Sequence, residues 1–145
     1  MLETDINTEV WLPVVGHEGV YEVSNKSRVR SVDRFIHDTG KTGTPRKRFR
    51  KGVLLKELIN HRGRAKVCLW KNKKKYFRFV YRLSMEAFVG KSPLTVDHLD
   101  EDITNNCITN LEYVSLQENR RRQAENIRER KINEVHDTRR RNRKS

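Results

Sequence analysis

The sequence has little cysteine and no long apolar stretch. Its two cysteines, Cys68 and Cys107, are too few and too far apart for a four-cysteine zinc site or a disulfide framework. We therefore expect two reduced thiols and no zinc. No run approaches the roughly 20 apolar residues that a membrane span requires, so no membrane association is expected either.

The first residues, MLETDINTEVW, lack the basic region and the following apolar region of a signal peptide. From this absence we expect a cytoplasmic protein. The 145 residues fit one domain, or one compact domain with an appendage.

Acidic residues are scarce relative to basic ones. The chain has 32 Lys and Arg against 19 Asp and Glu, which gives a net charge of +13. Solubility alone needs a net charge of only about 2 to 8 in a small domain. The excess favours a polyanionic partner, and nucleic acid is the first candidate.

Residues 1–52 predict an N-terminal β module followed by a basic loop. Tyr21 and Val23 share one face of a strand, and residues 24–27 have the composition of a turn, which predicts a β-hairpin. Residues 38–52 mix glycine, proline and threonine without an apolar period, which predicts a loop. That loop is either a solvated linker or a contact to nucleic-acid phosphates made by Arg46, Lys47, Arg48, Arg50 and Lys51.

Residues 53–122 predict a second hairpin, a short helix and a ββα unit. The hairpin strands are residues 66–70 and 76–81, with Lys73, Lys74 and Lys75 at its tip as candidate contacts to nucleic-acid phosphates. The spacing of Phe77 and Phe79 favours the sheet core over base stacking. Residues 82–90 place Leu83, Ala87 and Phe88 at helical spacing before a glycine.

From residue 95 onward the pattern is strand, polar loop, strand, helix. Ser115 and Glu118 form a capping box, so the helix is expected to begin at about Leu116. Residues 123–145 carry little apolar surface, which predicts a basic tail that is an exposed helix or disordered until it meets a phosphate backbone. Further phosphate contacts are expected from Arg120, Arg121 and Arg122.

The ββα segment carries residues suited to hydrolytic chemistry. The side-chain oxygens of Asp97 and Asn119 suit a hard cation such as Mg²⁺, and His98 can accept a proton from water at neutral pH. Consecutive strand residues point to opposite faces, so the strand must end or bulge near His98 if both are to serve one site. The alternative is that DEDITNN is an ordinary turn and that His98 makes a local hydrogen bond.

Three stretches resemble one family. VDHLDEDITNNCITNLEYVSLQEN resembles the HNH nuclease motif in the zinc-free form found in phage and intron-encoded homing endonucleases. VWLPVVGHEGVYEVSNKSRVRSVDR resembles the short module that often precedes that domain, and VYRLSMEAFVG resembles the segment just before its catalytic strand. The resemblance covers most of residues 10–120.

The resemblance implies an α+β fold in which N-terminal β-hairpins precede a ββα-metal unit and a basic C-terminal helix or tail. It implies a double-stranded DNA substrate and one divalent metal, Mg²⁺ or Mn²⁺, and it leaves the oligomeric state open. His98 would be the general base, and Asp97 and Asn119 would bind the metal. Asn110 would steady the hairpin and the histidine ring as a third catalytic residue, and Asn106 would brace the loop.

Two departures from the family pattern stand out. Residues 100–102 read Asp-Glu-Asp where the family usually reads Asp-Gly-Asn, and Tyr81 stands where a histidine is common. Neither removes a residue assigned to chemistry. The rival hypotheses are a non-catalytic nucleic-acid-binding protein derived from such a nuclease and an RNA-binding protein, which would explain the charge but not the spacing of Asp97, His98 and Asn119.

Overall fold

The computed structural model describes residues 7–143. Its N-terminal part is an antiparallel sheet of β1 (Trp11–Pro13), β2 (Tyr21–Ser24) and β3 (Val29–Ser31), in that order. Tyr21 and Val23 are both buried, and Ser27 closes the turn with a φ of 65°. The first predicted hairpin is therefore confirmed.

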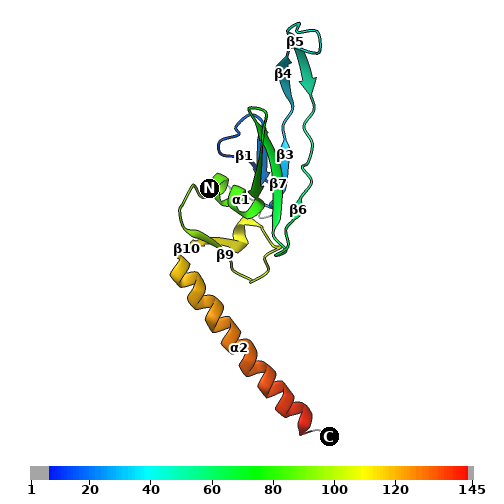
Figure 1. Ribbon diagram of the computed structural model, residues 1–145. Coiled ribbons are helices and arrows are strands. Elements are labelled where there is room, and N and C mark those ends of the chain that lie inside the picture. The colour runs from blue at the N-terminus through cyan, green and yellow to red at the C-terminus, as the bar shows by residue number, and fades with distance from the viewer. Residues whose placement is uncertain (1–6, 144–145) are drawn as a thin grey trace.

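A two-stranded ribbon leaves this sheet and projects from the body of the molecule (Figure 1). It consists of β4 (Arg34–Asp38) and β5 (Arg46–Arg50), so the prediction of a loop over residues 38–52 is wrong for β5. Phe35 and Phe49 pair across the strands with ring centroids 5.4 Å apart, and the Asp38 carboxylate accepts hydrogen bonds from Arg46 and Arg48. Because β5 has a single apolar residue and buries none, its sequence shows no alternation.

The second sheet contains β6 (Leu58–Ile59), β7 (Ala65–Lys71) and β8 (Lys74–Phe79). Its β7–β8 hairpin confirms the second predicted hairpin, and its tip is Asn72 and Lys73, whose φ values are 50° and 60°. The strand ends at Phe79 and not at residue 81, because Val80 already begins helix α1 (Val80–Phe88). Helical structure thus starts before residue 82.

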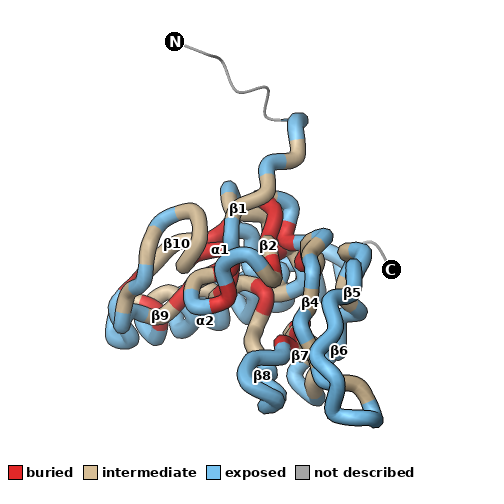
Figure 2. Tube along the Cα trace, turned by 90° about the horizontal axis from the view of Figure 1, so that it is seen from above, coloured by how far each residue is buried: buried red, intermediate tan, exposed pale blue. Residues whose placement is uncertain are grey.

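Only one face of this sheet lies against the core. Val67 and Leu69 are buried, whereas Phe77 pairs with Cys68 on the opposite face and is 54% exposed. The prediction that Phe77 belongs to the core is therefore wrong, because the core is filled from β7 and from α1. Figure 2 shows buried residues at β2, α1 and β9, whereas β8 and the β4–β5 ribbon contain none.

Helix α1 connects two hydrophobic clusters. Leu83 belongs to the cluster that contains Val23 and Val67, and Met85 packs with Val96 and Leu111 of the C-terminal part. The amide groups of Val89 and Gly90 both donate to the carbonyl oxygen of Met85, and Gly90 ends the helix with a φ of 122°. The two parts of the chain therefore share one packed helix.

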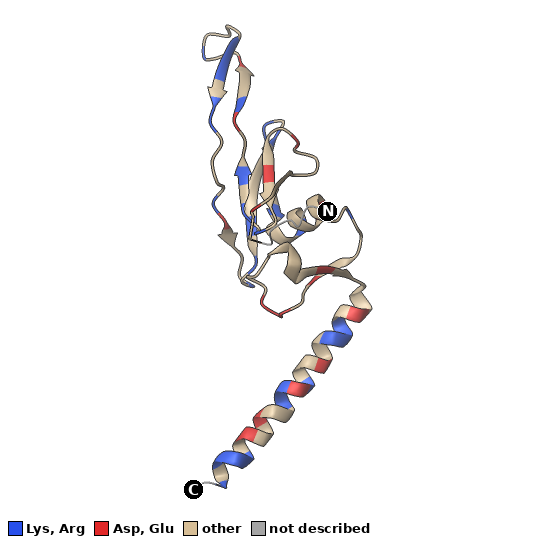
Figure 3. Ribbon diagram, turned by 180° about the vertical axis from the view of Figure 1, so that it is seen from behind, with Lys and Arg blue, Asp and Glu red and all other residues tan. Residues whose placement is uncertain are grey.

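The C-terminal part is a ββα unit. Strand β9 (Thr95–His98) pairs antiparallel with β10 (Leu111–Val114), which follows a short 3₁₀ helix, η1 (Ile108–Asn110). Helix α2 (Leu116–Asn142) begins where the capping box predicts, with Ser115 Oγ accepting from Glu118 N at 3.1 Å. It extends far beyond the body with both charge signs along its length (Figure 3). This architecture confirms the predicted α+β fold.

Candidate active site

His98 is the last residue of β9, and its ring is almost fully buried. Its Nε2 lies 2.9 Å from Asn106 Oδ1, and its ring meets that of Tyr81 edge to face at 5.8 Å between centroids. The strand ends at His98, as a shared site with Asp97 requires. Tyr81 therefore packs against the histidine at the position where the family often has another histidine.

Asn106 and Asn110 make different contacts from those expected. The family resemblance implied that Asn110 would steady the His98 ring, but the side chain that contacts the ring is Asn106. Asn110 instead organises the loop, because its Oδ1 accepts from Asp100 N and its Nδ2 donates to Asp100 Oδ1 and to Asn105 O. Both asparagines are buried, so their hydrogen bonds are shielded from competing water.

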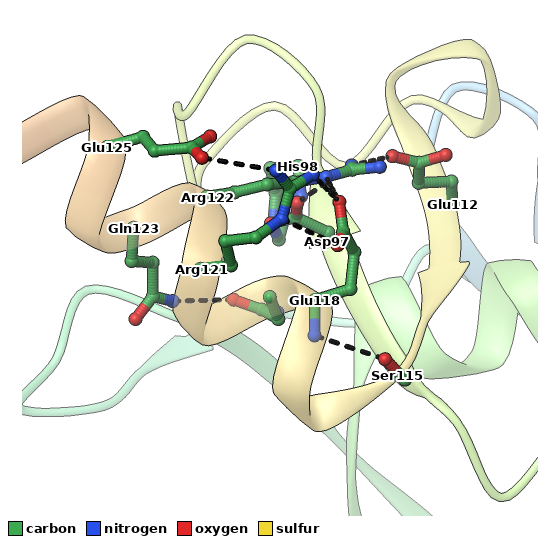
Figure 4. Close-up of polar contacts among 10 residues, drawn as sticks. Asp97, His98, Glu112, Ser115, Glu118, Arg121, Arg122, Gln123 and Glu125 are labelled. Carbon is green, nitrogen blue, oxygen red and sulfur yellow. Dashed lines mark hydrogen bonds and ion pairs between the residues drawn. The ribbon is translucent and has the colours of Figure 1, made fainter.

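Asp97 precedes the histidine and is half-buried. Its Oδ1 accepts from the His98 amide at 3.0 Å, and its Oδ2 lies 3.4 Å from Arg122 Nη1. Arg122 also pairs with Glu112 and Glu118 (Figure 4). These carboxylates raise the pKa of Arg122, and the hydrogen bonds from Arg121 and Arg122 lower the pKa of Glu118 to about 2. A fixed positive charge therefore stands beside Asp97.

Asn119 lies one turn into α2 and is the helix's buried residue. Gln123, one turn further along, donates from Nε2 to Asn119 Oδ1 at 2.7 Å. This bond orients the amide and leaves the second lone pair of the oxygen for another ligand. Residues four apart lie on the same face of a helix, so the helix alone brings these two side chains together.

Asp97, His98 and Asn119 line one open cleft of about 970 Å³. Arg120 and Arg122 line it as well. The structure thus brings Asp97, His98 and Asn119 together as predicted. Asn106 and Asn110 lie behind the cleft and not among its lining residues. The other predicted DNA contacts are elsewhere: Arg46, Lys47, Arg48 and Arg50 on β5, Lys51 just after it, Lys73 at the β7–β8 tip, Lys74 and Lys75 at the start of β8, and Arg121 paired with Glu118 and Glu125.

The donors in the cleft suit a hard divalent cation. Within residues 7–143 no three His, Cys, Asp or Glu side chains gather as a metal cluster. Asp97 and Asn119 supply one carboxylate and one amide oxygen, and Mg²⁺ or Mn²⁺ accepts such a set when waters and substrate phosphate complete it. Both cysteines are free, and neither lines the cleft. The residues present therefore fit the implied metal.

The acidic loop that follows His98 has an internal structural role. Asp100 accepts from the side chains of Asn105 and Asn110 and from the Asp102 amide, and these bonds hold the pKa of its carboxyl below the usual value. Asp102 accepts from the amide and hydroxyl of Thr104. Glu101 forms an ion pair with Arg130 of α2. The acids of this loop thus serve the loop and the helix.

Sequence reasoning missed four residues that the structure places at or behind the site. They are Ser27, whose hydroxyl donates to the Asn106 carbonyl oxygen, Gln123, and the cleft-lining pair Arg62 and Arg64. Gln123 could have been found from its spacing to Asn119. Ser27, Arg62 and Arg64 come from distant parts of the chain, and only the fold brings them to the cleft.

A ββα unit that presents aspartate, histidine and asparagine to one cleft defines the HNH class of nuclease fold. Comparison with known proteins agrees: residues 78–121 match the family described as HNH endonuclease, and residues 9–70 match the NUMOD4 motif. The chain belongs to the HNH homing endonuclease family.

One solved structure shows the same arrangement. It describes DNA binding and cleavage by the HNH homing endonuclease I-HmuI, with 31% sequence identity and a TM-score of 0.64. The match covers 81% of this chain and 59% of that one, so this chain spans little more than half of its relative's length. No curated protein matches the chain. None of the helices in residues 7–143 is long and apolar enough to cross a membrane.

Proposed function

We propose that the protein is a DNA endonuclease that hydrolyses phosphodiester bonds of double-stranded DNA with one divalent metal, Mg²⁺ or Mn²⁺, and a histidine base. The observation that carries this proposal is the convergence of Asp97, His98 and Asn119 on one cleft. The DNA binding and cleavage described for the homing endonuclease I-HmuI support DNA as the substrate and a homing role, and our proposal adds a phage or mobile element as the origin of the gene.

In this proposal His98 accepts the proton of the attacking water. Because an amide oxygen can only accept, the contact with Asn106 Oδ1 requires that Nε2 carry the ring proton. Nδ1 then holds the free lone pair, and among residues 7–143 it makes no hydrogen bond. The neighbouring asparagine thus selects the tautomer that a general base needs.

Asp97 and Asn119 would hold the metal. When bound, the metal would act as a Lewis acid that stabilises charge on the phosphate and on the leaving oxygen. Arg122 would have a second role, because its guanidinium lies 3.4 Å from Asp97 Oδ2 and restricts how that carboxylate can turn. Gln123 would keep the oxygen of Asn119 in place.

Binding would come from basic surfaces around the cleft. Strand β5, the lysines at residues 73–75 and the α2 residues Arg120 and Arg121 are exposed. The β4–β5 ribbon and α2 extend from opposite ends of the body (Figures 1 and 3). Contacts of this kind with phosphates make affinity fall steeply as salt rises.

The experiment that tests the function is cleavage of supercoiled plasmid by the purified chain with Mg²⁺ or Mn²⁺. Wild-type protein is expected to nick or linearise the plasmid. His98→Ala is expected to slow cleavage by about 10²- to 10⁴-fold, the usual contribution of a general base, while DNA affinity stays the same.

The matched control is His136→Ala, because His136 is exposed on the distal part of α2. It is expected to cleave like wild type. Equal cleavage by the His98 variant would remove the base assignment. Metal-independent binding without cleavage by wild-type protein would show instead that the chain is a non-catalytic binding protein.

A further inference from the structure

The far wall of the cleft is a turn that the sequence did not point to. Residues 60–64 connect β6 to β7 and lie beside the loop that follows His98 (Figure 1). A Cβ on Gly63 would stand 3.3 Å from Ile103 Cδ1, which shows how closely the turn approaches that loop. Asn60, Arg62 and Arg64 of the turn all line the cleft, opposite α2.

This turn is held by its own hydrogen bonds. Asn60 Oδ1 accepts from the amides of Arg62 and Arg64 at 3.0 and 2.9 Å, and Asn60 N donates to Arg64 O at 3.0 Å. Gly63 has a φ of +78°, a conformation that glycine takes without strain. The backbone of the two arginines is therefore already ordered before a ligand arrives, which lowers the entropic cost of binding.

The Tyr81 ring lies between Arg64 and His98 and contacts both. The guanidinium carbon of Arg64 lies 5.4 Å from the centroid of the Tyr81 ring, and the same ring contacts His98 edge to face. A guanidinium stacked on an aromatic face keeps its N–H edges available for a phosphate. Tyr81 thus links the position of Arg64 to that of the proposed base.

The charge of the cleft is not balanced. Six arginines but only three carboxylates line it. Arg122 and Arg130 are paired with carboxylates, and Arg82 donates to the carbonyl oxygens of Ser92 and Leu94. The other three are Arg62, Arg64 and Arg120, and none of these has an ion-pair partner within residues 7–143. They stand on both walls of the cleft.

We propose that Arg62 and Arg64 bind the phosphodiester backbone of the DNA strand that enters the cleft, and so hold the reacting phosphate against Asp97 and His98. This inference rests on the proposed function. It names the substrate contacts on the wall opposite α2, which come from the segment matched to the NUMOD4 motif. The upstream module would then be part of the substrate site and not only a neighbour of it.

The test is a DNA-binding titration of the full chain in EDTA, with a fluorescent duplex at several salt concentrations. Arg62→Gln and Arg64→Gln are each expected to reduce the slope of log affinity against log salt by about 0.9, the loss of one phosphate contact. Lys91→Gln removes the same charge at an exposed position outside the cleft and is expected to leave the slope unchanged. Arg64→Lys is expected to restore most of the slope.

The second measurement is the single-turnover cleavage rate at saturating DNA. Both glutamine variants are expected to be at least about tenfold slower than wild type, because a phosphate that is held loosely is misplaced relative to the base. Unchanged slopes would overturn the proposal. Reduced slopes with unchanged rates would overturn it too, since the arginines would then bind some other phosphate. If wild-type protein cleaves nothing, the proposed function fails, while the salt slopes still decide whether these arginines bind DNA.

Discussion

Glu101 adopts a backbone conformation that a glycine would adopt at lower cost. Its φ is +63°, and it occupies the middle of the Asp-Glu-Asp stretch where related nucleases usually have glycine. A non-glycine residue in this region costs about 1 to 2 kcal/mol. The glutamate side chain forms an exposed ion pair with Arg130 of α2, which stabilises the fold by about 0 to 1 kcal/mol. This gain offsets only part of the cost of the strained backbone.

The first stability prediction compares Glu101→Gly with Glu101→Ala. Both variants lose the ion pair, but only glycine relieves the backbone. We expect the glycine variant to be more stable than the alanine variant by about 1 kcal/mol. At ordinary positions the order is the reverse, because glycine loses more entropy on folding. Urea denaturation of both variants measures the difference.

Asp102 provides the control, since it lies in the same loop but does not have a positive φ. Asp102→Gly is expected to be less stable than Asp102→Ala. If glycine is the less stable substitution at both positions, the strain at Glu101 is not real.

At this scale the sequence predicts the residues whose chemistry is unusual for their position. Asp97, His98 and Asn119 are recognisable because a carboxylate, an imidazole and an amide recur at the spacing of one motif. Which asparagine meets the histidine was not predictable, since Asn106 and Asn110 are similar in type and only the path of the loop separates them. The sequence could not single out Arg62 as a site residue, because surface arginines are common in so basic a chain.

At the scale of elements, the β4–β5 ribbon has no core of its own. Every residue of β5 is exposed, and the ribbon depends on backbone pairing, the Asp38 ion pairs and the contact between Phe35 and Phe49. An isolated two-stranded hairpin is marginally stable at best. The ribbon should therefore open without the rest of the molecule unfolding.

Phe49→Ala tests this independence. Loss of one cross-strand aromatic pair, which is worth about 0.2 to 1 kcal/mol, is expected to speed amide exchange in the ribbon by up to about fivefold. The melting temperature should stay within about 1 °C of wild type, because no core contact is lost. Hydrogen exchange by mass spectrometry, with a thermal melt, measures both.

Phe77→Ala is the matched control, since Phe77 is about as exposed but belongs to the β7–β8 hairpin. It should leave exchange in the ribbon unchanged. A large fall in melting temperature with Phe49→Ala would mean that the ribbon is part of the main cooperative unit.

The β4–β5 ribbon shows which strands cannot be predicted from the sequence. Val67 and Leu69 reveal their strand because one face of it is buried, and Ser115 with Glu118 marks the start of α2 because capping is a local interaction. Residues 46–50 gave no such pattern, because their pairing buries nothing and is fixed only by the partner strand. The position of Val80 in a helix, directly after a strand, likewise depends on the core that it fills.

At the scale of the whole molecule, the β2–β3 turn of the upstream module contacts the loop behind the active site. Ser27 Oγ donates to the carbonyl oxygen of Asn106, whose side chain holds the His98 ring. The Ile108 amide also donates to Asn25 O at 2.9 Å. Ser27, Asn106 and His98 are all buried, so this chain of contacts is shielded from water. The β2–β3 turn therefore positions the proposed base.

Ser27→Gly isolates that contribution. Glycine accepts the positive φ of this position, so the substitution removes the hydroxyl without straining the turn. The buried carbonyl of Asn106 loses its donor, which should cost about 1 kcal/mol of stability. We expect the single-turnover cleavage rate at saturating DNA to fall by about tenfold, while DNA affinity stays the same, because a small displacement of the base slows proton transfer but touches no phosphate contact. In ¹⁵N NMR spectra the His98 ring nitrogens should show a mixture of tautomers.

Ser84→Ala is the matched control, because Ser84 is a buried serine whose hydroxyl has no hydrogen-bond partner among residues 7–143. It should cleave at the wild-type rate and show the wild-type His98 spectrum. A Ser27 variant that loses stability but keeps both the rate and the single tautomer would mean that the turn supports the fold alone. A changed tautomer with a lower rate would show that the two modules act as one catalytic unit, because a hydroxyl 71 positions away from His98 in the sequence would then govern how its ring is protonated.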